Sequence, residues 1–174
     1  MPSAPTSPAT AFLRNWLPLV LWCFAIAVES TDMMSAGHTG GLLSLILDRY
    51  LHLALSDESI ALLNLLLRKA GHIIGYAVMS LLFFRAYRNH LRWRHGLSSD
   101  SPRSDGWNWC WRAQWALLGV MFAVLVATAD ELHQMTIPSR TGTWHDIVLD
   151  TSAAIVAQIL LWKWLARRHA TVTS

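Results

Sequence analysis

Charged side chains are scarce in this sequence, and their scarcity excludes an ordinary soluble domain. Only 14% of its 174 residues are charged, whereas a soluble domain carries roughly 25% charged residues. Hydrophobic residues make up 53% of the chain. A soluble bundle would need polar residues at helical spacing along each apolar segment. Residues 113–129 contain only Gln114 and Thr128 as clearly polar side chains, so the sequence predicts a membrane protein.

Cysteine and N-terminal basic residues are also rare. The two cysteines are Cys23, inside an apolar run, and Cys110, beside a basic segment. We expect these positions to lie at different depths in the membrane, so no disulfide and no cysteine-based metal site is predicted. The first ten residues lack Lys and Arg, and the apolar run that follows ends without a cleavage site of small residues. We therefore expect a retained membrane span and not a signal peptide.

The sequence contains long apolar runs that could form membrane-spanning helices. About 20 mostly apolar residues can cross a bilayer as a helix, and four runs approach that length. They cover residues 12–29, 70–87, 113–130 and 146–164. A further stretch, residues 42–55, is interrupted by Asp48, Arg49 and His52, which suits an amphipathic helix lying in the interface. The expected fold is a single-domain, all-α membrane protein. It has about four transmembrane helices plus one or two amphipathic interfacial helices in the first extracytoplasmic loop.

Basic residues are unevenly distributed between the two sides of such a bundle. Most Lys and Arg residues fall in the N-terminal segment, in the loop at residues 88–112 and in the C-terminal segment. The opposite side holds only Arg49, Arg68, Lys69 and Arg140. Short loops rich in Lys and Arg stay in the cytoplasm, so we expect both termini and the basic loop there. This basic side suits anionic inner-leaflet lipid; no fold that presents a basic patch to nucleic acid is visible.

A dense polar cluster lies between the third and fourth apolar runs. Charged groups at the edge of lipid-facing segments cost several kcal/mol each unless they are paired or functional. Acidic groups at a helix C-terminus also oppose the helix macrodipole, whereas Asp146, in the first turn of the fourth helix, is favoured by it. Pro138 should prevent the third helix from continuing. The cluster comprises Asp130, Glu131, Gln134, Pro138, Arg140, Asp146 and Asp150.

A second polar stripe lies near the start of the second apolar run. Lys69, His72 and Tyr76 are spaced by three and four residues, so a helix places them on one face, with Arg68 beside them. Alone, the stripe is more typical of snorkelling cations with an interfacial His and Tyr. Because it shares the outer side with the acidic cluster, we expect one outward-facing pocket in which Lys69 and Arg140 balance the carboxylates. The predicted binding residues are Arg68, Lys69, His72, Tyr76, Asp130, Glu131, Gln134, Arg140, Asp146 and Asp150.

These ordered motifs resemble the VanZ-like family of bacterial integral membrane proteins over residues 12–165. The family's K-x-x-H-x-x-x-Y element is similar to residues 69–76. Its D-E-x-x-Q-x-x-x-P-x-R element is similar to residues 130–140, and its D-x-x-x-[ND] step to Asp146 and Asp150. The polar break after the first span looks like residues 29–31, but the family's glycines after the acidic step are replaced by Thr151-Ser152-Ala153-Ala154. The resemblance implies a multi-pass protein of the bacterial inner membrane and, through the family's named member, a link to teicoplanin resistance.

Three functions are compatible with the pocket. The favoured one is binding of an anionic envelope lipid or lipid-linked glycan, with Arg140 suited to bidentate contact with phosphate. The second is a membrane-embedded hydrolase or transferase acting on such a lipid, with His72 or Glu131 as general acid or base. Its nucleophile is undetermined; the candidates are Ser30, Ser139 and Tyr76. The third is a structural ion-pair network without a ligand.

Neither a cofactor nor a metal is predicted. Imidazole and carboxylate groups are metal ligands, but their spacing here matches no standard metal site. The residues with such groups are His72, Asp130, Glu131, His133 and Asp146. The oligomeric state is left open.

Overall fold

The chain folds into helices, as the computed structural model shows for residues 7–53, 55–97, 107–140 and 142–173. Among these residues there is no strand, which confirms the all-α prediction. Four helices are long and apolar enough to cross a membrane, as predicted. In chain order the elements are α1 (Pro8–Glu29), the 3-10 helix η1 (Asp32–Met34), α2 (Ala36–Arg49), α3 (Asp57–Arg94), α4 (Trp107–Cys110), α5 (Ala113–Gln134) and α6 (Trp144–Thr173).

Helix α3 is much longer than the predicted span at residues 70–87. It begins after Ser56, whose side chain accepts a hydrogen bond from the backbone N–H of Ser59, and Asp57 and Glu58 occupy its first turn. These are favourable groups for a helix N-terminus. Its 38 residues extend over roughly 57 Å at the usual helical rise, well beyond a hydrocarbon core of about 30 Å. Hydropathy detects only the apolar part of such a helix.

The basic loop is correspondingly shorter than predicted. Residues 88–94 continue α3, and α4 forms a short turn of helix just before α5. The central part of the predicted loop, residues 98–106, lies outside the described residues. Cys23 and Cys110 form no disulfide bond with one another, in agreement with the expectation that they do not pair.

The predicted amphipathic helix is present but begins earlier in the chain. We expected it at residues 42–55, whereas α2 covers Ala36–Arg49 and is preceded by η1. The chain turns after α2, and His52 has a left-handed φ of 52°, which few residues other than glycine adopt. Asn64 of α3 donates a hydrogen bond to the carbonyl of Ala36 at 3.0 Å. This bond attaches the start of α2 to the N-terminal part of α3.

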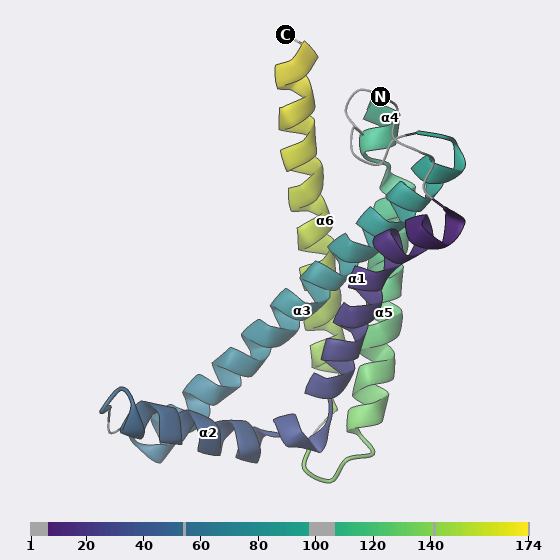
Figure 1. Cartoon of the computed structure of the whole chain (residues 1–174). Coiled ribbons are helices and arrows are strands. Elements are labelled where there is room, and N and C mark those ends of the chain that lie inside the picture. Colours follow the sequence, from purple (N-terminus) through teal and green to yellow (C-terminus); the bar gives the residue numbers. More distant parts are fainter. Residues whose placement is uncertain (1–6, 54, 98–106, 141, 174) are drawn as a thin grey trace.

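The two ends of the bundle carry different elements. In Figure 1 the start of α1, the end of α6 and α4 lie at one end, and α2 and the end of α5 lie at the other. Helices α1, α5 and α6 pack against α3. Because α2 crosses the N-terminal part of α3, an open pocket lies between α1, α2 and α3.

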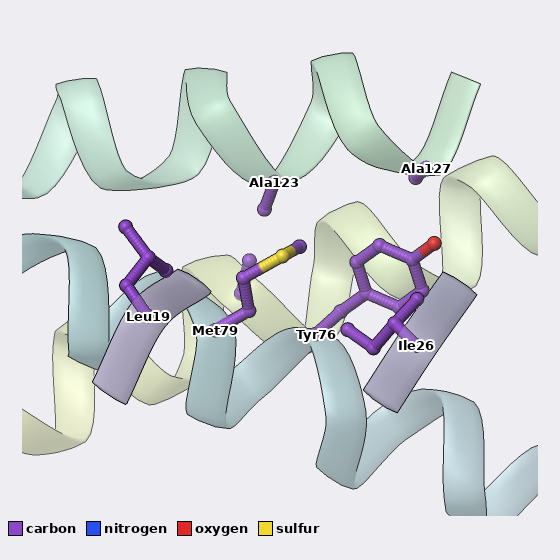
Figure 2. Packing of buried hydrophobic residues seen from close by; sticks show 7 residues of the cluster. Leu19, Ile26, Tyr76, Met79, Ala123 and Ala127 are labelled. Carbon is purple, nitrogen blue, oxygen red and sulfur yellow. The ribbon is translucent and has the colours of Figure 1, made fainter. Parts of the chain in front are cut away.

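Small residues allow the spanning helices to pack closely. Figure 2 shows Leu19, Ile26, Tyr76 and Met79 packed beneath the alanines of α5, in a cluster that also includes Ala154 of α6. A Cβ atom at Gly119 would lie 2.9 Å from the carbonyl oxygen of Ser80, so α5 approaches α3 where only glycine fits. Small residues at helix interfaces are typical of membrane proteins, and large apolar side chains on the outside face the lipid. The described members of the Figure 2 cluster are Leu19, Ile26, Tyr76, Met79, Ala123, Ala127 and Ala154.

Candidate functional site

Asp130 connects three helices at the α2 end of the bundle. Its carboxylate accepts hydrogen bonds from the Tyr76 hydroxyl at 3.0 Å and from the Gln134 amide at 3.1 Å. It also accepts a bond from the Ser30 hydroxyl at the end of α1. Asp130 and Gln134 lie one helical turn apart, as predicted. The carboxylate therefore joins α1, α3 and α5 through polar contacts.

Two pairs of oppositely charged or polar groups join α3 to α6. Lys69 forms an ion pair with Asp146, and the second carboxylate oxygen of Asp146 accepts a bond from the Thr143 hydroxyl at 3.1 Å. One turn deeper, Nδ1 of His72 lies 3.2 Å from Oδ2 of Asp150, which is completely buried. The His72 ring also stacks on Tyr76 with ring centroids 6.2 Å apart. The stripe on α3 is thus a set of contacts between helices and not only interfacial side chains.

Glu131 is held by the return between α5 and α6. It is 1% exposed, and its Oε2 accepts a hydrogen bond from the backbone N–H of Thr143 at 2.7 Å. The return passes so close to α5 that a Cβ atom at Gly142 would lie 2.5 Å from the carbonyl oxygen of Glu131. Any larger residue at position 142 would clash with α5, so glycine is required there. This return brings Glu131 to within 4.8 Å of ligand atoms of His72 and Asp150.

Arg140 does not pair with a carboxylate, contrary to prediction. Its Nη2 donates hydrogen bonds to the backbone carbonyls of Glu29 and Thr31, the latter at 3.0 Å. These carbonyls lie at the C-terminal end of α1, where backbone acceptors have no helical partner and the dipole favours a cation. Burial lowers the pKa of the Arg140 guanidinium, and the nearby charge of Arg68 lowers it further. Arg140 therefore holds the end of α1 and carries positive charge close to Arg68.

A cavity of about 440 Å³ opens beside these residues, between α1, α2 and α3. Apolar side chains form most of its wall, and polar groups gather on the part shared with the network. Arg68 makes no hydrogen bond or ion pair with any described residue. The polar lining includes Glu29, Thr39, Asn64, Arg68, His72 and Arg140, and the apolar lining Ala25, Val28, Met34, Leu42, Leu43, Ile46 and Leu67.

The predicted site residues therefore gather at one end of the bundle, but not in a single contact network. Arg68 and Arg140 line the cavity, with His72 shared between cavity and network. The nucleophile candidate Ser139 donates instead to Asp32 at the exposed turn, and His133 is exposed. The predicted members bonded to one another are Lys69, His72, Tyr76, Asp130, Gln134, Asp146 and Asp150.

Some contributors were missed by sequence reasoning. Thr143 stands three residues before Asp146 at the start of α6, a spacing that resembles a capping box and was available as a signal. Its hydroxyl and backbone N–H contact two carboxylates of the site. The apolar wall from α2 had no comparable signal, because its position depends on how α2 folds back over α3.

The sequence profile of the VanZ/LLP1 family matches residues 12–166. The chain belongs to the VanZ/LLP1 family. The match covers α3 and α5 completely, most of α1 and α6, and every residue of the network, so the resemblance noted in the sequence is confirmed. The protein is a multi-pass membrane protein. No curated protein and no solved structure matches the chain significantly.

Proposed function

We propose that this VanZ/LLP1 family member binds an anionic envelope lipid or lipid-linked glycan in the cavity between α1, α2 and α3. The observation that supports this most strongly is the chemistry of the lining. Side chains such as Leu42, Ile46 and Leu67 form an apolar wall, and Arg68 and Arg140 lie at the polar side. Such a lining suits a molecule with a hydrocarbon part and an anionic head group.

The positive charge at the cavity supports the same proposal. Arg140 uses Nη2 for backbone carbonyls, and its Nε has no hydrogen-bond partner among the described residues. Arg68 is half-buried and likewise has no bonded partner there. Two guanidinium groups close enough to repel one another would be stabilised by a phosphate or carboxylate between them.

The distribution of Lys and Arg supports an orientation in which this cavity faces the outer side of the plasma membrane and both termini face the cytoplasm. The ligand would then come from the outer leaflet. A fluorescent protein that matures only in the cytoplasm, fused to the C-terminus, should fluoresce. A dark fusion that is nevertheless inserted in the membrane would reverse this orientation and place the ligand in the inner leaflet.

Mass spectrometry of co-purified lipids tests the binding. Wild type, Arg68→Gln and Arg49→Gln are purified in mild detergent from the same membranes. Arg49→Gln is the matched control, because it removes the same charge from a residue on the exposed surface of α2, outside the cavity. We expect one anionic lipid to be enriched with wild type and Arg49→Gln and to fall about ten-fold or more with Arg68→Gln, as for loss of a charge-assisted contact. Equal lipid content in all three proteins would contradict the proposal.

Arg140→Ala provides a second variant for the same measurement. Because Arg140 also holds the end of α1, its lipid content is compared only alongside thermal unfolding of the same sample. Loss of lipid in both arginine variants, with a normal unfolding temperature for Arg68→Gln, assigns the effect to binding.

A role in envelope homeostasis, including teicoplanin resistance, follows if the bound lipid belongs to cell-wall synthesis. Raised expression of wild type should then raise the teicoplanin concentration that stops growth, and equal expression of Arg68→Gln should not. An identical response to both proteins would separate resistance from lipid binding.

A further inference from the structure

Three side chains from three helices converge beneath the cavity. His72 comes from α3, Glu131 from the end of α5 and Asp150 from the second turn of α6. One ligand atom from each lies within 4.8 Å of the other two. Imidazole nitrogen and carboxylate oxygen are ligands of divalent metal ions. Sequence spacing does not reveal this set, because its three members lie on three separate helices.

Two carboxylate oxygens in this group are buried without a bonded partner. Glu131 is 1% and Asp150 0% exposed, and neither Oε1 of Glu131 nor Oδ1 of Asp150 has a hydrogen-bond partner among the described residues. The other oxygen of each is held, by the Thr143 N–H and by His72 respectively. The carboxylates are therefore fixed in position with one oxygen of each unsatisfied. A buried charged oxygen without a partner is costly.

Charge balance at this end of the bundle favours an additional cation. The half-buried and buried carboxylates outnumber the permanent cations around them, and Arg140 contacts carbonyls instead of a carboxylate. Either protons or a cation must offset the excess negative charge in a region of low dielectric. The carboxylates are Glu29, Asp130, Glu131, Asp146 and Asp150, and the permanent cations are Arg68, Lys69 and Arg140.

We propose that His72, Glu131 and Asp150 bind a divalent transition-metal ion such as Zn²⁺ or Mn²⁺. One nitrogen and two carboxylate ligands suit these ions better than Ca²⁺, which prefers oxygen ligands alone. The backbone N–H of Thr143 and the packing of α3 against α6 orient the ligands. This site is independent of lipid binding, although His72 also borders the cavity.

Metal titration of the purified protein tests the site. Wild type is stripped with a chelator in detergent, and Zn²⁺ or Mn²⁺ is returned while bound metal and the thermal unfolding temperature are measured. We expect a single high-affinity ion per chain and a rise in unfolding temperature on its return. Glu131→Gln and Asp150→Asn preserve side-chain shape. Each should weaken affinity by more than the roughly 10–100-fold that loss of an outer-shell partner costs.

Matched controls separate this site from surface binding. His133→Ala removes an exposed imidazole of α5, and Asp48→Asn removes an exposed carboxylate of α2. Both should bind the ion as wild type does. Arg68→Gln should also retain the ion, so failure of the lipid proposal and failure of the metal proposal give different results.

Specific results would overturn the proposal. They include wild type that takes up no ion, ion binding unchanged in Asp150→Asn, or ion binding lost in His133→Ala. If Glu131 and Asp150 instead share a proton, chelation should leave the unfolding temperature of wild type unchanged. If a ligand variant fails to fold, the bound metal and unfolding temperature of wild type, measured after chelation and after metal return, still test the proposal.

Discussion

At the α4 end of the bundle, arginine side chains pack over aromatic rings, whereas at the α2 end carboxylates are enclosed between helices. Arg112 lies over Trp109 and Trp115 at 5.5 and 5.3 Å, and Arg168 lies 4.1 Å from the ring of Trp164. Both arginines are exposed. Glu131 and Asp150, at the other end, are almost fully buried. Arg92, near the end of α3, is also buried at the α4 end, but the two arginines that lie over Trp rings remain at the surface, whereas Glu131 and Asp150 are enclosed between helices.

The two kinds of charged group are stabilised in different ways. Exposed cations above aromatic rings gain modest attraction and remain hydrated, and they also suit the headgroup region of a membrane. Enclosed carboxylates need partners to offset their charge. In this chain such partners come from the end of α1, from α3 and from α5, although one oxygen each of Glu131 and Asp150 has none among the described residues. Substitutions at the two ends should therefore change the free energy of unfolding by different amounts.

The largest effect is expected from Arg140→Ala. The change leaves the carbonyls of Glu29 and Thr31 without a donor and removes positive charge from the end of α1. Hydrogen bonds from a charged group contribute about 1.5–3 kcal/mol each, so we expect a loss of about 3 kcal/mol in the free energy of unfolding in detergent. Arg140→Lys should recover part of it. A stability equal to wild type would remove the contrast between the two ends.

An intermediate effect is expected from Lys69→Gln. The Lys69 side chain is 40% exposed and that of Asp146 14%, so solvent screens their attraction, and exposed pairs contribute up to about 1 kcal/mol. We expect a loss of that order. A double-mutant cycle with Asp146→Asn measures the coupling directly. Additive effects of the two substitutions would mean that the pair contributes nothing to stability.

The smallest effect is expected from Arg168→Gln at the α4 end. An exposed cation over a Trp ring contributes about 0.5–1 kcal/mol, and Trp164 remains able to contact lipid headgroups. We expect the unfolding free energy to fall by about 0.5 kcal/mol, with no change in bound lipid or metal. A loss as large as that of Arg140→Ala would mean that charge at both ends is equally structural.

Local features of the site were predictable because they depend on neighbours in the chain. Asp130 and Gln134 are one turn apart and do form a hydrogen bond, and Asp146 does lie in the first turn of α6. The choice between distant partners was not predictable. Lys69 pairs with Asp146, while Arg140 contacts backbone carbonyls. From the sequence, several carboxylates were equally good partners for Lys69 and Arg140. The rotation of each helix about its axis decides which of them comes within reach.

By itself, the sequence determined that four helices are long and apolar enough to cross a membrane and that the predicted site residues gather at one end of the bundle. The scarcity of charge and the spacing of three or four residues within a helix act locally, so they can be read without a fold. Only the tertiary structure decided that α2 closes a cavity beside Arg68, and that His72, Glu131 and Asp150 meet. Those arrangements depend on how α3, α5 and α6 cross and on the tight return at Gly142.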